Sequence, residues 1–525
     1  MLPRSLVIAL GMLTAFSASA TRYYVKAGST GAGTGLSWTN AFTDLQEALS
    51  VVITGDEIWV AAGQYRPTSS TDRTVSFVLR DGVDLIGGFA GTETSVDERD
   101  IASNPTTLNG DIGQLGEVSD NTYTVLRGNN ITTTLVVDGF RIINANGGTS
   151  GNGGGSRLTN ALGGLVLMRN CTFFNNRSTN YGGAIYLAAA NLTIENCEFL
   201  NNQSGNGGAI HNGNNNGGYS NLVLRDCLFK GNTANIGACL HNTVRYETLL
   251  IDRCFFTNNL SANNVIVIDD FLSAKLMNSA IIGNSVNGFS SEVLRVNSFG
   301  SSTSPFDMIN CTIAHNRNTS ASTIQGAMVQ LEDNHMRVSN CIIYGNTPYA
   351  GGQMRNGPIV SSSLVEGGYA AGTQILNTDP QFVDPNASAP SNFDATGFDY
   401  TLLASSPAIN VGNNAAVDPT ALFDLALNSR IQGLAVDLGC YESSITTSLT
   451  TRENPASICY YDAVQGDLVF RTAGSSTTSQ YRVFGGNGQL LAQGRRTGDR
   501  IPLNLGSGIH LFVEDGGEVL RFWVP

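Results

Sequence analysis

The sequence contains almost no lysine, little charge and no long hydrophobic run beyond its first twenty residues. Only three of its 525 residues are lysines, and the formal net charge is −13 at pH 7. Because no basic patch could neutralise phosphates, nucleic acid is not an expected partner. No stretch is long and apolar enough to be a transmembrane span. Only one segment, near the start, keeps a helical period of 3.6 residues, so a helical fold is also disfavoured.

The first twenty residues have the composition of a secretory signal peptide. Arg4 supplies the positive start, residues 6–16 form a short apolar run, and residues 17–20 read Ser-Ala-Ser-Ala, a small-residue cleavage site. We therefore expect residues 1–20 to be a signal peptide. The mature protein is expected to be secreted, or attached to the outer membrane or cell surface of a bacterium.

A short phrase, Cys-x-(Phe/Ile)-x-x-Asn, recurs through the middle of the chain. Seven copies follow one another at intervals of 26, 30, 27, 25, 32 and 30 residues, and the copy at Ser279 has serine in place of cysteine. A period of this size that carries a strand and a turn residue is typical of a solenoid. The first and third positions of the phrase lie two residues apart and therefore face the same side of a strand. The repeat predicts a parallel β-helix with one coil per copy.

Stacked coils would place the same residue of each copy above its counterpart, roughly 4.8 Å away. We expect asparagine to sit where the strand turns, since it tolerates left-handed dihedrals, and its amide to hydrogen-bond along the axis. The two expected ladders are structural, not ligand-binding: Cys171, Cys197, Cys227, Cys254, Cys311 and Cys341, and Asn176, Asn202, Asn232, Asn259, Asn284, Asn316 and Asn346.

The cysteines of the ladder are expected to be small interior hydrophobes and not disulfides. Ser279 shows that a bond is not required at its rung. Cys239 lies on a different strand, and Cys440 and Cys459 lie outside the repeat, so a bridge between these last two stays open.

The chain divides into a capped all-β solenoid and a small C-terminal β-sandwich. A cap of residues 21–56 contains an amphipathic helix within 41–53, which would cover the open end of the solenoid. The β-helix covers 57–367, and residues 368–442 break its period. A linker rich in serine and threonine, 443–456, precedes a module of short alternating strands and hairpin turns at 457–525.

Several segments resemble known bacterial families. Residues 23–68, with Gly-Gly-Phe-Ala-Gly-Thr-Glu at 87–93, resemble the opening of secreted right-handed β-helix proteins of the pectin-lyase-like superfamily. The coils with Gly-Gly-Ala-Ile and Phe-x-x-Asn are similar to repeats of chlamydial polymorphic outer-membrane proteins. Residues 377–385, 399–414 and 436–442 resemble the choice-of-anchor Q region that ends many exported β-helix proteins. These resemblances imply a right-handed β-helix and an exported protein.

The C-terminal module resembles a type IX secretion sorting domain. Residues 481–494 and 500–513 carry the matching strands, although the family's opening motif is reduced to Glu-Asn-Pro at 453–455 and the end lacks lysine. The resemblance implies that 457–525 contacts secretion machinery.

The residues that act in the enzymes of this superfamily are missing. Asp269-Asp270 is the only adjacent aspartate pair, and it has no accompanying Gly-His-Gly or Arg-x-Lys motif. Related lyases need a basic residue beside Ca²⁺-binding carboxylates, whereas Lys230 and Lys275 are isolated. We therefore predict no catalytic residue, no metal site and no cofactor. If the protein is nevertheless a lyase, Ca²⁺ is the cofactor that we expect.

One outward column is a candidate ligand site. His211 and His241 lie 30 residues apart beside inward-facing residues, so both should point outward and stack; Tyr186 precedes them, and Asp269 and then Arg295 follow. A stripe of Tyr186, His211, His241 and Asp269 could bind a sugar chain, or it could be an ordinary solvated sheet face. Two histidines are too few for a tight zinc site.

Together these features predict adhesion or carbohydrate binding by a monomer, with glycans or environmental surfaces as partners. The alternative is a polysaccharide lyase or glycoside hydrolase that acts on an acidic polysaccharide.

Overall fold

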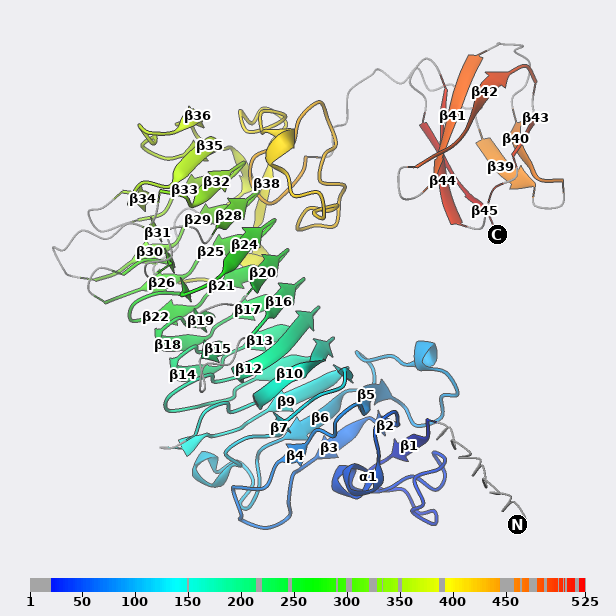
Figure 1. Ribbon diagram of the computed structural model, residues 1–525, viewed down its shortest axis with the longest axis vertical. Coiled ribbons are helices and arrows are strands. Elements are labelled where there is room, and N and C mark those ends of the chain that lie inside the picture. Colours follow the sequence, from blue (N-terminus) through cyan, green and yellow to red (C-terminus); the bar gives the residue numbers. More distant parts are fainter. Residues whose placement is uncertain are drawn as a thin grey trace, which may run out of the picture. The chain divides into compact units, whose positions relative to one another are not determined.

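The computed structural model describes most of residues 20–524 (Figure 1). The predicted signal peptide, except Ala20, and the predicted linker, except Ser443, lie outside the described residues. Other segments outside the description are short: 149–150, 214–219, 244–247, 289–290, 299–304, 321–327, 333, 348–351, 387–391, 457, 463–464, 472–478, 486–488, 499, 504, 506–507, 515–518 and 525. The chain forms two units, Met1–Ser444 and Ile445–Pro525.

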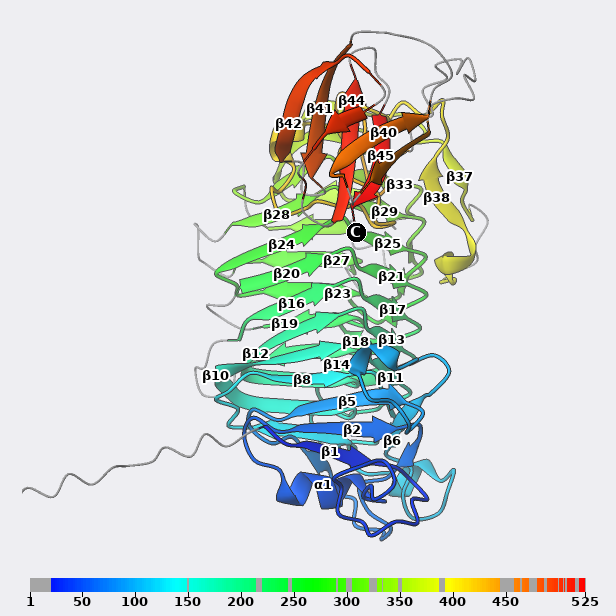
Figure 2. The ribbon, with the colours of Figure 1, turned by 90° about the vertical axis from the view of Figure 1, so that its right-hand side faces the viewer.

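The first unit is a right-handed parallel β-helix built on a 31-stranded sheet, as the repeat and the resemblance predicted (Figures 1 and 2). Its coils have three faces. Face one consists of β1 (Arg22–Val25), β2 (Glu57–Ala61), β5 (Asp84–Phe89), β8 (Leu135–Asp138), the second halves of β10 (Ser156–Arg169) and β12 (Ile185–Glu195), β16 (Leu222–Arg225), β20 (Thr248–Asp252), β24 (Ser273–Met277), β28 (Phe306–Ile309), β32 (Arg337–Ser339), β35 (Ile359–Val365) and β36 (Thr373–Leu376).

Face two carries the cysteine phrase. Its strands are β3 (Gly63–Tyr65), β6 (Thr106–Asn109), β9 (Phe140–Ile143), β11 (Thr172–Phe174), β13 (Glu198–Leu200), β17 (Leu228–Lys230), β21 (Phe255–Thr257), β25 (Ala280–Ile282), β29 (Thr312–Ala314), β33 (Ile342–Tyr344) and the end of β35. A small sheet follows it at one corner, with strands β14 (Gln203–Asn206), β18 (Thr233–Ile236), β22 (Leu260–Ser261), β26 (Ser285–Val286) and β30 (Arg317–Asn318).

Face three carries the candidate site. Its strands are β4 (Phe77–Val78), β7 (Leu126–Asn129), the first halves of β10 and β12, β15 (Ile210–Gly213), β19 (Leu240–Asn242), β23 (Ile266–Asp269), β27 (Leu294–Asn297), β31 (Val329–Leu331) and β34 (Met354–Arg355). Because β10 and β12 belong to both face three and face one, the faces join into one sheet.

The asparagines of the repeat form a continuous hydrogen-bonded ladder inside the β-helix. Each Nδ2 donates to the Oδ1 of the next asparagine, over 3.2 Å from Asn176 to Asn202 and 3.0 Å from Asn202 to Asn232. Each Nδ2 also donates to a main-chain carbonyl of the previous coil, such as that of Phe199 from Asn232 at 2.8 Å. The ladder continues through Asn259, Asn284, Asn316 and Asn346 and ends at Gln353. It thereby satisfies buried polar groups at every turn.

The expectation that these asparagines adopt left-handed dihedrals is wrong. The left-handed residue is the one before each of them, with φ of 55° at Asn175 and 71° at Gly231, and the other members of that column are Asn201, Asn258, Gly283, His315 and Gly345. A second left-handed column precedes the cysteines, at Asn170, Asn196, Asp226, Arg253, Asn278, Asn310 and Asn340. Since the preceding residue makes the turn, the ladder asparagine can direct its amide into the core.

The aromatic and cysteine columns stack in the core beside the asparagines. The rings of Phe199 and Phe229 lie 4.6 Å apart and nearly parallel. The cysteines of the ladder are buried free thiols, and where serine replaces one, the Oγ of Ser279 accepts from the main-chain N of Cys254 at 3.0 Å. Cys440 is also a buried free thiol, while the side chain of Cys459 lies outside the described residues.

The N-terminal helix α1 (Leu45–Val51) is shorter than predicted. The side chain of Asp44 accepts from the main chain of Gln46 and caps the start, and the chain becomes extended at Val52. Leu45, Ala48 and Leu49 are buried against the first coils.

The segment that breaks the period runs back along the outside of the β-helix after β36. Figure 2 shows its strands β37 (Phe382–Asp384) and β38 (Asp399–Leu402) beside the coils of face two. Phe393 and Tyr400 pack in one hydrophobic cluster with Ala314 of face two. Ion pairs add to this packing: Lys230 with Asp394 at 3.0 Å and Lys275 with Asp418 at 2.5 Å.

The second unit is a β-sandwich of two antiparallel sheets. One sheet contains β39 (Ile458–Asp462), β40 (Asp467–Arg471) and β43 (Arg500–Pro502), and the other β41 (Ser479–Gly485), β42 (Leu490–Arg496), β44 (Gly508–Glu514) and β45 (Val519–Val524). Leu468, Val483, Ile501 and Phe512 form its core. In the part of both units that the structure describes, no helix has the length and hydrophobicity to cross a membrane.

Candidate functional site

One column of outward-facing side chains runs the length of face three. The strand register places these residues above one another: Val78, Arg127, Arg157, Tyr186, His211, His241, Val267, Arg295, Gln330 and Arg355. We call this set the outward column. Their neighbours in the same strands, such as Ile210 and Leu240, point inward to the core.

Three of the predicted site residues, Tyr186, His211 and His241, come together in the middle of the outward column. The rings of Tyr186 and His211 are 5.7 Å apart and nearly parallel, and the Nδ1 atoms of the two histidines lie 3.1 Å apart. Tyr181 covers His211 with its ring 4.5 Å away. His211 is therefore 4% exposed and Tyr186 8% exposed. The expectation of an open stripe at these residues is wrong because neighbouring side chains cover them.

Burial also keeps the two histidines neutral. Desolvation lowers the pKa of His211 well below its usual value, and the nearby His241 adds to the shift. Desolvation, with a smaller contribution from Arg295, lowers the pKa of His241 to about 4. One Nδ1 must donate to the other, so the pair can satisfy its own hydrogen bond without a ligand.

Asp269 is not a member of the outward column, contrary to the sequence prediction. Val267 is in register with His241, and Asp269 lies two residues further along the same strand, opposite Asn297. Its carboxylate pairs with Arg295, which is in the column, and burial raises the pKa of Asp269 to about 6. The prediction failed because the coil that follows His241 has 26 residues, so Val267 lies above His241, whereas Asp269 is 28 residues away.

No group of three or more histidine, cysteine, aspartate or glutamate side chains could hold a metal ion among the described residues. His211 and His241 alone offer too few ligands for a tight site.

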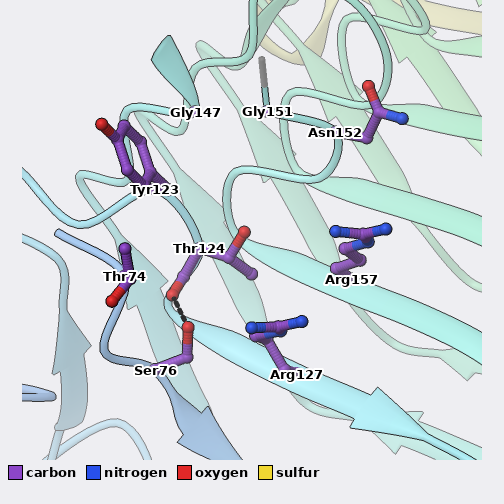
Figure 3. Close-up of a pocket in the computed structure, with 9 residues that line it drawn as sticks. All are labelled: Thr74, Ser76, Tyr123, Thr124, Arg127, Gly147, Gly151, Asn152 and Arg157. Atoms are coloured by element: carbon purple, nitrogen blue, oxygen red, sulfur yellow. Dashed lines mark hydrogen bonds between the residues drawn. The ribbon is translucent and has the colours of Figure 1, made fainter.

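The open part of the outward column begins two coils before His211, towards the N-terminus. Figure 3 shows a pocket with Arg127 and Arg157 on one side and Tyr123 and Thr74 on the other. Its volume is about 190 Å³, and its remaining lining consists of Ser76, Thr124, Gly147, Gly151 and Asn152. Gly147, Gly151 and Asn152, which belong to one glycine-rich stretch of the sequence, thus supply part of the wall.

The two pocket arginines have no acidic partner among the described residues. Arg127 is exposed and Arg157 is half-buried, with its guanidinium 6.0 Å from the ring of Tyr186. A third arginine, Arg73, lies over the ring of Tyr123 at 4.3 Å, but its guanidinium donates to the carbonyls of Asn121 and Asn146. The pocket therefore has an unpaired positive charge in a protein whose net charge is −13.

The chemistry of the lining favours binding over catalysis. Guanidinium groups form paired hydrogen bonds with carboxylates, sulfates and phosphates. The lining contains hydroxyls, an amide and one phenol, but no carboxylate, histidine, lysine or cysteine. A general acid or base with a pKa near neutrality is therefore missing from its lining.

Sequence reasoning missed Arg127, Arg157 and Tyr123, although a signal was present. Arg127 and Arg157 are 30 residues apart, the same interval that drew attention to His211 and His241. Extending the column upstream from Tyr186 by two more periods would have found the two arginines.

No family model and no curated protein matches this chain. Among solved structures, it is similar to a pectate lyase, Pel9A, at 14% identity, with a TM-score of 0.46, over 81% of this chain and 97% of that one. It is also similar to a rhamnogalacturonan lyase at 12% identity and a TM-score of 0.38, over 71% and 95% of the two chains. A structure of XylC with xylose has 8% identity and a TM-score of 0.34, over 81% and 99%. At these values the likeness concerns the path of the chain and not the chemistry of a site.

Proposed function

We propose that this protein binds an anionic polysaccharide on face three of its β-helix, and that the pocket of Arg127 and Arg157 receives an acidic group of that polymer. The observation that carries the proposal is the pair of arginines on successive coils, unpaired among the described residues. In an acidic protein, two adjacent guanidiniums without partners repel each other, and an anionic ligand would relieve that repulsion.

The long face and its surroundings support a polymeric ligand over a small molecule. The pocket is open to solvent, and its two arginines stand on successive coils, so its cationic wall extends along the axis of the β-helix. Tyr123 offers an apolar ring with a polar tip beside the arginines, a combination that suits a sugar ring with hydroxyls.

We infer that binding serves attachment to a glycan-bearing surface. The signal-like residues 1–20 and the sorting-like module 457–525 support a secreted or cell-surface location, with the module as the export element. Deletion of 457–525 should then retain the protein in the periplasm of its native bacterium. Export without the module would contradict this role.

The binding proposal is tested with polygalacturonate and its fully methyl-esterified form, which lacks the charge. The intact protein should bind the charged polymer, and Arg127→Gln with Arg157→Gln should weaken binding at least about tenfold, because charge-assisted hydrogen bonds contribute about 1.5–3 kcal/mol each. The control Arg337→Gln with Arg500→Gln removes the same charge at exposed sites that already have acidic partners. Equal affinities of the two double variants would overturn the proposal.

A second candidate function, cleavage of the same polymer, has one observation in its favour. Two buried carboxyl groups near the outward column have raised pKa values, because burial raises that of Asp269 to about 6 and that of Glu292 to about 7. Carboxyl groups with such values can act as general acids. Both, however, are engaged by arginines, Arg295 and Arg355. Release of reducing or unsaturated products, with and without Ca²⁺, distinguishes cleavage from binding.

A further inference from the structure

The C-terminal module presents a polar surface on the outward side of its strands β41 and β42. In this antiparallel pair, Gln480 lies opposite Arg495 and Arg482 lies opposite Gln493. Directly opposite residues share a face of the sheet, so these four side chains form a two-by-two patch. We call this set the Arg–Gln patch.

The Arg–Gln patch is exposed and is not needed for the core of the sandwich. All four of its side chains are exposed, whereas the alternate residue Val483 is buried and Tyr481 stacks on Phe512 at 5.4 Å. A hollow of about 500 Å³ lies over the strands, lined by the patch together with Tyr481 and Gly494. These four side chains are therefore available to a ligand without any change in the core.

The two arginines of the patch are free to bind a ligand. Among the described residues, neither Arg482 nor Arg495 has an acidic partner, in contrast to Arg500, which pairs with Asp467 at 3.1 Å. Residues 457–525 contain six arginines and six acidic residues, so the net charge of −13 belongs to the rest of the chain. The module thus lacks the acidic excess that would repel a polyanion.

The geometry favours a chain of separated charges over a single anion. Arg482 and Arg495 stand on a diagonal of the patch, where the two residues of such a pair lie about 7–8 Å apart, and a glutamine amide occupies each of the other two corners. Guanidiniums carried by residues at that spacing can contact acidic groups on neighbouring units of a polymer, and amides can donate to and accept from the hydroxyls between them.

We propose that the Arg–Gln patch is a second polysaccharide-binding surface, which recognises the carboxylate or sulfate groups of an acidic glycan. This inference goes beyond the function proposed for face three, and it would stand even if the Arg127 pocket bound no polysaccharide. Two sites in one chain, on units joined by a linker segment, would raise the apparent affinity for a long polymer by avidity.

The test uses the full-length protein and polygalacturonate, with Arg482→Gln and Arg495→Gln as one double variant. We expect the dissociation constant to rise at least about tenfold and the dependence of affinity on salt to become weaker, since two contacts with anionic groups are lost. Arg337→Gln with Arg500→Gln is the charge-matched control, and it should bind like the unmodified protein.

The outcomes separate this surface from the Arg127 pocket. If both surfaces bind, the variants at Arg127 and Arg157 and at Arg482 and Arg495 each weaken binding, and their combination removes the avidity. A patch variant that matches the control overturns the inference and leaves the pocket untouched. A patch variant that loses binding only to vesicles containing anionic phospholipid overturns it in favour of a membrane ligand.

Folding of the patch variant is checked by its thermal transition. If the glutamine variant loses the transition of the module, Arg482→Lys with Arg495→Lys keeps the charge while removing the planar forks, and a smaller loss of affinity is then expected. An unchanged affinity in that variant, together with an unchanged salt dependence, contradicts recognition by the guanidiniums.

Discussion

The interior asparagine ladder and the outward column of face three run in parallel along the same coils, with the same spacing, yet they differ in composition. The ladder keeps one residue type from Asn176 to Asn346, whereas the outward column changes from arginine to tyrosine, histidine, valine and glutamine. Every coil must satisfy the same buried groups in the core, and asparagine does so each time. The outward positions have no such common requirement, so their composition can follow a ligand.

The outward column itself is open at one end and closed in the middle. Arg127 lies in an open pocket, while His211 is covered by Tyr181 and hydrogen-bonds to His241. Outward direction therefore does not ensure access, and the closed part contributes to stability instead of binding.

Replacing a ladder asparagine should have the largest effect on stability. Asn232→Ala removes the bonds from Asn232 to Phe199 and Asn259 and those from Asn202 to Asn232, all of them buried. Because each buried group left without a partner costs about 1–3 kcal/mol, we expect the free energy of unfolding to fall by about 4 kcal/mol. Urea unfolding followed by circular dichroism measures it, and polysaccharide binding at low temperature should be retained. A loss below 1 kcal/mol would contradict the ladder's role.

The histidine pair should make stability depend on pH. The folded pKa of His241 is about 4, against about 6.5 in the unfolded chain. Between these values only the unfolded chain binds the proton, so stability falls as the pH falls from 6.5 to 4, by about 1.4 kcal/mol per pH unit. His211, with its lowered pKa, acts in the same direction. Relative to His241→Gln, the intact protein should therefore lose up to about 3 kcal/mol by pH 4.

The comparison with His241→Gln is needed because buried carboxyl groups titrate in the opposite direction. Burial raises the pKa of Asp269 and Glu292, so these groups favour the folded state as the pH falls through the same range. Because both carboxyl groups are present in both proteins, their contributions cancel in the difference between the two free energies of unfolding. Parallel stability curves between pH 4 and 7 would exclude a buried neutral His241.

The cysteine column should tolerate serine, in contrast to the asparagine ladder. The chain already has serine at two equivalent rungs, where the Oγ of Ser279 donates to Met277 at 2.7 Å and that of Ser363 donates to Ser361 at 2.8 Å. Cys227→Ser can make the same bond to the carbonyl of Arg225, which the thiol now makes at 3.1 Å. We expect a loss of about 1 kcal/mol, since a hydroxyl replaces a buried thiol. A loss as large as that of Asn232→Ala would contradict the expectation that the cysteine column tolerates substitution better than the asparagine ladder.

The smallest effect on stability is expected at an ion pair that joins the segment 368–442 to the coils. Lys275→Gln removes the ion pair with Asp418, but the lysine side chain is 44% exposed and solvent screens the pair. The loss should be under about 1 kcal/mol. Hydrogen exchange should rise around Asp418 but not in the coils. Lys26→Gln is the matched control, because Lys26 donates to the carbonyl of Gly91 and has no acidic partner among the described residues.

The period of the repeat was sufficient to predict the coils and their stacking. Phe173, Phe199 and Phe229 occur at the same position of each copy, and side-chain alternation in strands then assigns them to the core. The placement of Asp269 failed because coil lengths vary by several residues, and counting along the chain cannot reveal where a coil is shortened. The pocket of Arg127 depends on Tyr123, whose position is not set by the period.

The sequence alone determined the β-helix, since repeated residues at regular intervals can bury one core only by stacking. Which outward side chains reach solvent was decided by the tertiary structure, because that depends on the path of loops such as the one carrying Tyr181 over His211. The same holds for Lys230 and Lys275, isolated in the sequence, whose partners Asp394 and Asp418 come from a segment more than a hundred residues away that returns along the coils. Access and pairing are properties of surfaces in contact, and no local pattern encodes them.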